Sequence, residues 1–294
     1  MVTLDNQCLQ AFVSVAECAS FSVAAERLHL TQSAVSKRIA ILEQQVGKKL
    51  FDRIARQVTL TEAGNALLPR AKHILQEYES AIQALNDLSG KAQGVLRIAI
   101  SHHLGLHRLP PILKIFARQY PMVNLDIEFM DSEKAYEQVL HGQSEVAVIT
   151  LALDSHQNIF SKKIWTDPLR FICASDHPLT KIEVPNLNDL SQYPVILPGL
   201  NTYTGRIIQN LFDSQDIPLK STLSTNFLET ISTMVEIGLG WSVLPETLVK
   251  NLHVMTPDYT EVVRELGYIH HRKRSLSNAA VAFLQLLENS SQIN

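Results

Sequence analysis

The sequence predicts an α/β protein with an all-α N-terminal part, and three observations carry this prediction. Over residues 1–58, apolar side chains recur three or four positions apart, which is typical of short helices. A heptad-spaced apolar stripe follows over residues 59–89. From about residue 95, strand patterns and helix patterns alternate. Because 294 residues exceed what one core usually holds, we expect more than one domain.

Composition and charge exclude several classes of protein. Hydrophobic residues make up 46% of the chain and charged residues 19%, which excludes a disordered or collagen-like chain. No apolar run is long enough to span a membrane, and Asp5 and Glu17 precede the first basic residue. We therefore expect no membrane association, no signal peptide and a cytoplasmic location. Cys8, Cys18 and Cys173 are too few and too scattered for a disulfide framework.

The net charge of −3 conceals a basic segment. From Arg27 to Arg56 there are seven basic side chains and two acidic ones, whereas residues 91–294 carry 17 basic and 20 acidic groups. A local cluster of cations suits the phosphate backbone of a nucleic acid, whatever the charge of the whole chain.

Three short helices and a two-stranded wing are expected within residues 1–58. A hydroxyl just before a helix accepts a hydrogen bond from an otherwise unpaired backbone amide, so we expect Ser22 to cap the second helix and Thr31 the third. Gly47 would end the third helix, and residues 51–59 would form the wing.

The helices around residues 22–44 have the helix-turn-helix layout, in which the second helix enters the major groove by its N-terminal end. With Val35, Ile39 and Leu42 buried, short polar side chains and a cation share the exposed face, and they suit base edges and phosphates. Arginines of the wing would contact the flanking backbone or the minor groove. The alternative is a polar face that contacts only solvent. The expected DNA-binding residues are Thr31, Gln32, Ser33, Ser36, Lys37, Arg38, Arg53 and Arg56.

Residues 59–89 predict one long helix, capped by Thr59 or Thr61, with Glu62 completing a capping box. Its apolar positions alternate in spacing between four and three, so the stripe stays on one face and predicts a partner helix. The alternative is a helix that packs on its own domain. The expected dimerisation residues are Ile74, Tyr78 and Leu85.

Strand and helix patterns alternate after a break near residues 89–94. The expected strands are 95–101, 123–130, 145–150, 163–174, 194–198, 220–225, 240–244 and 265–271. The expected helices are 110–119, 132–141, 203–214, 227–238 and 275–289. Such alternation predicts a mostly parallel sheet covered on both faces, divided between two lobes, with ligands bound beyond the carboxyl ends of the strands.

Several motifs of the N-terminal part resemble those of one protein family. They read Phe-x2-Val-Ala-Glu at 12–17, Ser-Phe-Ser-x-Ala-Ala-x2-Leu at 20–28, Gln-Ser-Ala-Val-Ser at 32–36, Leu-Phe-x-Arg at 50–53 and Leu-Thr-x-Ala-Gly at 60–64. Over residues 4–75 the chain closely resembles the DNA-binding domain of LysR-type transcriptional regulators. The resemblance implies promoter DNA and RNA polymerase as partners and a homodimer or homotetramer as the assembly.

The C-terminal part resembles the effector domain of the same family, whose fold is like that of type 2 periplasmic binding proteins. The matching stretches are residues 96–98, 109–121, 142–148 and 238–245. The expected division is a winged helix-turn-helix domain at 1–58, a linker and dimerisation helix at 59–89 and an effector-binding domain at 90–294. Lobe I would comprise about 95–162 plus 267–294, and lobe II about 163–266.

The resemblance places a small-molecule effector in the cleft between the lobes. Each expected contact group follows a strand and precedes a helix, so unpaired helix amides would favour a carboxylate or another anion. The alternative for each hydroxyl is a plain helix cap. The expected effector-binding residues are Ser101, His102, Thr150, Pro198, Asn201, Thr202, Asn226 and Phe227.

Metal binding and catalysis find little support. His103 and His107 have the spacing of two metal ligands on a helix, but no cysteine or carboxylate lies near them in the sequence. We therefore expect no metal site, and the preferred interpretation is a histidine that hydrogen-bonds the effector. Neither a nucleophile elbow, a phosphate loop nor a His-Glu-x2-His run is present, so we expect no enzyme and no cofactor. The rival interpretations are a solute-binding receptor and an enzyme on the same α/β frame.

Overall fold

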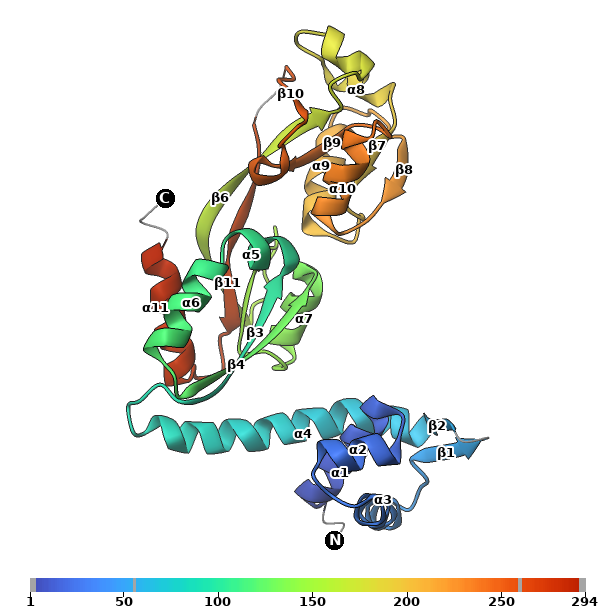
Figure 1. Ribbon diagram of the computed structural model, residues 1–294, viewed down its shortest axis with the longest axis vertical. Coiled ribbons are helices and arrows are strands. Elements are labelled where there is room, and N and C mark those ends of the chain that lie inside the picture. Colours follow the sequence, from blue (N-terminus) through green and yellow to red (C-terminus); the bar gives the residue numbers. More distant parts are fainter. Residues whose placement is uncertain (1–3, 55–56, 259–260, 291–294) are drawn as a thin grey trace. The chain divides into compact units, whose positions relative to one another are not determined.

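The computed structural model describes residues 4–54, 57–258 and 261–290. It divides into two compact units, Met1–Asn86 and Asp87–Asn294 (Figure 1). Arg56, one of the expected DNA-binding residues, lies outside the described residues, as does the side chain of Arg53.

The N-terminal unit begins with three short helices, α1 (Asn6–Cys18), α2 (Phe21–Arg27) and α3 (Gln32–Val46). Thr31 caps α3 as expected, since its Oγ1 accepts a hydrogen bond of 3.2 Å from the backbone amide three residues on. Gly47 ends α3 at φ +66°, in the left-handed region that glycine enters without strain. The prediction that Ser22 caps α2 is wrong. Ser20 is the cap, because its extended backbone lets the hydroxyl accept from a first-turn amide while Ser22 already lies within the helix.

The wing consists of two antiparallel strands, β1 (Phe51–Ile54) and β2 (Gln57–Leu60). Val35, Ile39 and Leu42 are buried at helical spacing, so α3 is held by one face and leaves the other free. The core joins the helices to the wing and to the following helix: the rings of Phe12 and Phe51 lie 5.4 Å apart, and Ala71 is fully buried with them.

Helix α4 (Glu62–Asp87) follows the wing directly. Its cap is Thr61, whose hydroxyl accepts a hydrogen bond of 3.0 Å from the amide of Gly64. The predicted capping box of Thr59 and Glu62 is wrong, because Thr59 is part of β2 and pairs across the wing.

One mixed sheet runs through the C-terminal unit. Its described strands have the order β10-β6-β11-β5-β3-β4, with β9 on the side of β6. They are β3 (Gly94–Ser101), β4 (Val123–Met130), β5 (Val146–Thr150), β6 (Ile159–Cys173), β9 (Ser242–Pro245), β10 (His253–Met255) and β11 (Val262–His271).

The prediction of a mostly parallel sheet is wrong. Strand β3 is parallel to β4 and β5, but β11 is antiparallel to β5 and β6, and β6 is antiparallel to β9 and β10. The reason is that β6 and β11 are long strands that cross between the lobes in opposite directions (Figure 1).

Helices surround this sheet in both lobes. Lobe I carries α5 (His102–His107), α6 (Pro110–Gln119), α7 (Ser132–Leu140) and α11 (Asn278–Ser290). Lobe II carries the parallel strands β7 (Val195–Leu197) and β8 (Ser221–Ser224), the helices α8 (Leu187–Ser191), α9 (Tyr203–Asp213) and α10 (Leu228–Glu236), and 3-10 turns at Pro178–Lys181 and Glu246–Leu248. The patterns had not indicated α5, α8 or β10, which are all short.

Both faces of the sheet are covered in lobe I, as expected. Ile98 and Ile100 of β3 belong to a core shared with α6 and α11, whereas Ala99 between them belongs to a core shared with α7. Alternating side chains of one buried strand thus serve two apolar layers. Within the described residues, no helix combines the length and the apolarity needed to cross a membrane.

Candidate functional site

The N-terminal end of α3 presents a polar surface. Thr31, Gln32, Ser33 and Lys37 are exposed, and Ser36 is half-buried. The exposed side chains are hydroxyl and amide groups and one cation. They lie at the end of α3 that would enter a groove of DNA first.

Three of the expected DNA-binding side chains, Thr31, Ser33 and Arg38, already have partners inside the unit. Thr31 Oγ1 caps α3 and also lies 3.0 Å from the hydroxyl of Ser33. Arg38 Nη2 donates a hydrogen bond of 2.8 Å to Oε1 of Gln7, which draws the guanidinium toward α1. Lys37 makes no ion pair within the described residues.

Acidic side chains neutralise part of the basic segment. Glu17 forms ion pairs with Arg27 at 2.8 Å and with Lys72 at 2.7 Å. Glu43 pairs with Lys49 at 2.7 Å and also accepts a hydrogen bond from the backbone of Leu50. Burial acts to raise the pKa of Glu43, but these hydrogen bonds outweigh it and hold the pKa below its ordinary value.

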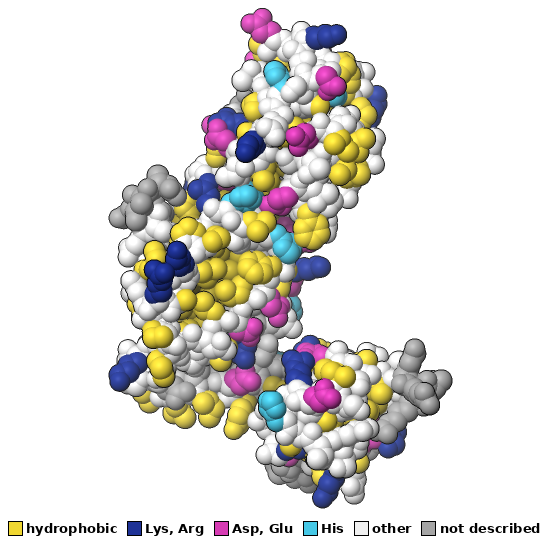
Figure 2. Space-filling model, in the orientation of Figure 1, with side chains coloured by type: hydrophobic (Ala, Val, Ile, Leu, Met, Phe, Trp, Pro, Cys, Tyr) yellow, Lys and Arg dark blue, Asp and Glu magenta, His cyan; other side chains and the backbone are white. Residues whose placement is uncertain are grey.

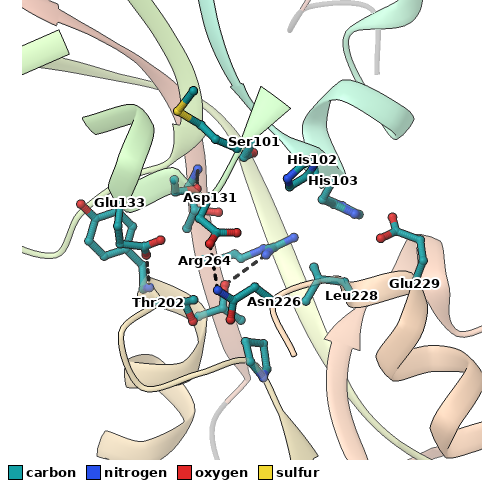
Figure 3. Close-up of a pocket in the computed structure, with 16 residues that line it drawn as sticks. Ser101, His102, His103, Asp131, Glu133, Thr202, Asn226, Leu228, Glu229 and Arg264 are labelled. Carbon is teal, nitrogen blue, oxygen red and sulfur yellow. Dashed lines mark hydrogen bonds between the residues drawn. The ribbon is translucent and has the colours of Figure 1, made fainter. Parts of the chain in front are cut away.

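A pocket that is open to solvent lies between the two lobes of the C-terminal unit (Figure 3). The expected effector residues that line it are Ser101, His102, Thr150, Pro198, Thr202 and Asn226. Asn201 and Phe227 are not among its lining residues. Asn201 is exposed, and the Phe227 ring is 52% exposed and packs against His102 with their centroids 5.1 Å apart.

The hydroxyl groups of this pocket differ in what they contact. Thr202 Oγ1 accepts a hydrogen bond of 3.0 Å from the amide of Gly205 and donates one of 2.7 Å to the carbonyl of Gly199, so it caps α9. Ser101 precedes α5 but makes no side-chain cap bond to the described residues. The alternative of a plain cap therefore applies to Thr202 and not to Ser101.

A buried arginine of β11 also lines the pocket. Arg264 Nε donates a hydrogen bond of 2.7 Å to Asp167 on β6, and Nη1 donates one of 3.1 Å to Thr204. Its Nη2 has no hydrogen-bond partner among the described residues, although the side chain is only 3% exposed. Leaving a buried donor unpaired is costly, so this atom suits an acceptor group of a ligand.

Polar contacts join the lobes across the pocket. Asn226 of lobe II donates a hydrogen bond of 2.8 Å to Asp131 of lobe I, and Glu133 of lobe I accepts one from the backbone amide of Tyr203 at the start of α9 (Figure 3). Burial raises the pKa of Glu133. A carboxylate of the protein therefore lies at the helix end where a ligand anion was expected.

A cluster of two histidines and a glutamate lies at the other side of the pocket. His107 Nε2 is 3.1 Å from Oε1 of Glu229, which belongs to the first turn of α10 in lobe II. Proximity in the sequence did not reveal this carboxylate, because 122 residues of sequence separate partners that the fold brings together. Burial, together with the charges of Arg264, His107 and Arg108, lowers the pKa of His103 to about 3. Its ring is therefore neutral at neutral pH.

Family comparisons match both units. Residues 7–65 match the family model described as the bacterial regulatory helix-turn-helix protein, lysR family, and residues 89–292 match the LysR substrate binding domain. The chain belongs to the LysR family. It is a DNA-binding transcriptional regulator with an effector-binding domain, and its relatives are regulators, not enzymes.

One curated relative and two solved structures illustrate the match. The HTH-type regulator YwqM of Bacillus subtilis (strain 168) is 31% identical over 245 residues, which cover 83% of each chain. Full-length CbnR, solved in complex with its target DNA, aligns with a TM-score of 0.72 and 21% identity over 98% of this chain and 100% of CbnR. The effector-binding domain of QuiR, solved in complex with shikimate, aligns with a TM-score of 0.62 and 16% identity over 69% of this chain and 99% of that domain.

Sequence reasoning missed all four aspartate, glutamate and arginine residues that line this LysR-type pocket. The lining residues not expected as effector contacts are His103, Met130, Asp131, Ser132, Glu133, Tyr203, Thr204, Leu228, Glu229 and Arg264. Three of them, Asp131, Ser132 and Glu133, follow β4, and the rule that placed Ser101 after β3 would have found them. Arg264 carried no such signal, because it lies inside a strand whose crossing between the lobes was not predicted.

Proposed function

We propose that this LysR-type regulator binds promoter DNA through the N-terminal end of α3 and the wing, and that a small molecule between the lobes controls this binding. The division that we propose assigns DNA binding to residues 1–58, dimerisation to 59–89 and effector binding to 90–294. RNA polymerase is the further partner that such a regulator would contact.

The exposure of Gln32, Ser33 and Lys37 on the first turns of α3 supports their role at the DNA. A recognition helix reads bases with this end, where its side chains reach the groove first. Thr31 and Arg38 would act mainly by holding α3, the first as its cap and the second through Gln7. Lys37 would contact a phosphate.

An exposed apolar face on α4 supports the dimerisation role. The exposed fractions are 42% for Ile74, 53% for Tyr78 and 65% for Leu85, and Ile82 beside them is 47% exposed. The N-terminal half of α4 instead packs on its own core through Ala71. We infer that the second half of α4 pairs with α4 of another copy, as dimer or tetramer, because water would otherwise cover a contiguous apolar stripe.

The pocket favours an effector that carries both an anionic group and hydrogen-bond donors. The unpaired Nη2 of Arg264 is the donor for a carboxylate, and it is the single observation that most supports an anionic group. Asp131 and Glu133 are acceptors that would repel a second anion but would bind hydroxyl or ammonium groups. A hydroxy acid or an amino acid meets both conditions. QuiR, which has the same fold, binds shikimate.

Effector binding would change the contacts between the lobes. Asp131 with Asn226 and Glu133 with Tyr203 join the lobes directly, so a ligand that enters must either replace these bonds or add to them. The equilibrium between arrangements shifts only by the difference in affinity of the ligand for each.

The test is a screen of small hydroxy acids and amino acids by thermal shift, followed by binding of labelled promoter fragments with and without each hit. We expect at least one carboxylate to raise the melting temperature and to change the affinity for DNA. Arg264→Gln should abolish this response. A response that is unchanged in this variant would contradict the proposed pocket.

A further inference from the structure

The two histidines and the glutamate at the edge of the inter-lobe pocket form a compact group of ligand atoms. His103 and His107 lie one turn apart on α5 with ring centroids separated by 4.7 Å, and Glu229 comes from α10 of the other lobe. One ligand atom from each residue lies within 4.8 Å of the other two. Figure 3 shows the Glu229 side chain directed across the cleft toward His103.

His103 is the unusual member of this group. Its side chain is buried, with only 6% exposed, yet neither ring nitrogen has a hydrogen-bond partner within the described residues. Burying an imidazole without satisfying either nitrogen costs free energy, and native structures rarely leave such groups unpaired. A ligand that accepts the lone pair of one ring nitrogen would remove this cost for that nitrogen.

We propose that His103, His107 and Glu229 bind one divalent transition-metal ion that joins the two lobes. Two imidazoles and a carboxylate form a ligand set that zinc uses, with a fourth position left for water or a substrate atom. Nickel and cobalt accept the same nitrogen and oxygen donors, whereas magnesium and calcium prefer oxygen alone. The ligand set therefore selects a transition metal.

The ligand atoms of His103, His107 and Glu229 are close enough to bind one ion after small side-chain movements. Two ligands at about 2.0–2.1 Å from a tetrahedral zinc lie about 3.3 Å from one another. His107 and Glu229 are 3.1 Å apart, and all three ligand atoms lie within 4.8 Å. The side chains of His107 and Glu229 are 29% and 37% exposed, so both have room to turn toward the buried His103.

The charges around the cluster are balanced before an ion binds. Besides His107, which is itself one of the proposed ligands, Arg264 and Arg108 are the cations that influence the pKa of His103. Both contact Asp167, at 2.7 Å and 3.7 Å, and Glu229 supplies a second negative charge. Two positive and two negative groups therefore surround the site, and the arginines do not impose a net repulsion on a divalent cation.

Such an ion would stabilise the arrangement of the lobes described above, because its ligands come from both of them. His103, Glu229 and Arg264 line the same pocket, so an anionic group of the effector would meet the ion as well as the arginine. This last consequence rests on the proposed function, whereas metal binding itself does not.

The test is isothermal titration calorimetry of the untagged full-length chain with zinc chloride and, separately, cobalt chloride, without DNA or effector. We expect one ion per chain. His103→Ala, His107→Ala and Glu229→Gln should each weaken binding by more than about tenfold, the loss that even an outer partner of a metal ligand can cause. Zinc should also raise the melting temperature of the wild type and not that of Glu229→Gln.

Glu229→Gln is the decisive variant because it keeps the size of a partly exposed side chain and should not disturb folding. His141→Ala, which removes a 65% exposed histidine outside the cluster, is the matched control and should bind zinc like the wild type. The proposal is wrong if neither ion binds more tightly than about 1 mM, an affinity of only about 4 kcal/mol, or if Glu229→Gln and His103→Ala bind as the wild type does. Because no DNA is present, failure here would leave the proposed function untouched.

Discussion

Arg264 on β11 and Asp167 on β6 stand directly opposite each other in the sheet, joined by a 2.7 Å hydrogen bond and exposed by only 3% and 2%. The two strands that carry them are the ones that cross between the lobes. This ion pair therefore fixes the crossing strands beside the pocket, and it also holds the guanidinium so that Nη2 remains available to a ligand.

Asp167→Asn should destabilise the C-terminal unit by about 3–5 kcal/mol, because it leaves Arg264 buried without its counter-charge. Urea unfolding followed by circular dichroism measures the change. The control is Lys163→Gln, which removes an exposed ion pair with Glu265, 2.9 Å long, between the same two strands. We expect Lys163→Gln to lower the free energy of unfolding by at most about 1 kcal/mol. Equal losses in both variants would show that burial of the first pair has no special importance.

Ser101→Ala and Thr202→Ala should have different effects, although both residues line the pocket. Thr202 caps α9, so its loss should cost about 1 kcal/mol of stability as well as effector affinity. Ser101 makes no cap bond within the described residues, so its loss should leave stability unchanged. Effector affinity should fall by about 10- to 150-fold, the range for one hydrogen bond to a charged group. An unchanged effector midpoint in Ser101→Ala would remove this residue from the site.

Leu85→Glu should dissociate the dimer or tetramer, because a charge in the interface between two paired α4 helices would be desolvated without a partner. Sedimentation equilibrium of the full-length chain measures the mass. Ser80→Glu adds the same charge to an exposed position on another face of α4 and should leave the mass unchanged. If Leu85→Glu keeps both the wild-type mass and DNA binding, the interface between copies does not include this face of α4.

Glu43→Gln should destabilise the N-terminal unit at neutral pH by about 1–3 kcal/mol, since it weakens hydrogen bonds from Lys49 and Leu50. The pKa of Glu43 is lower in the folded state than its ordinary value of 4.5. The stabilisation is therefore present above that value and is lost as the pH falls through the lowered pKa. Thermal unfolding of both proteins across this acidic range should show their difference shrinking, and a difference that stays constant would contradict the role of the charge.

Local patterns were enough to predict most of the elements that border the candidate sites, but not the short helix α5. The periodic burial of Val35, Ile39 and Leu42 identified the face of α3 that stays free, and Thr31 and Gly47 marked its ends as the structure has them. The polar residues after β3 and β5 were likewise expected at the pocket, and Ser101 and Thr150 line it. Helix caps were less certain, because Ser20 and Ser22 both offer a hydroxyl and only the backbone conformation distinguishes them.

By itself, the sequence determined the order and type of most helices and strands, the basic segment and the family. These features depend on side chains close together along the chain, whose spacing repeats with the helix or the strand. Only the tertiary structure decided the direction of β11 against β5 and β6, the pairing of Arg264 with Asp167 and the meeting of His107 with Glu229. The two side-chain pairs join residues that are 97 and 122 positions apart in the sequence. The direction of β11 depends on which strands it lies beside in the sheet. No local periodicity encodes such contacts, because they follow from how the buried surfaces of whole elements pack together.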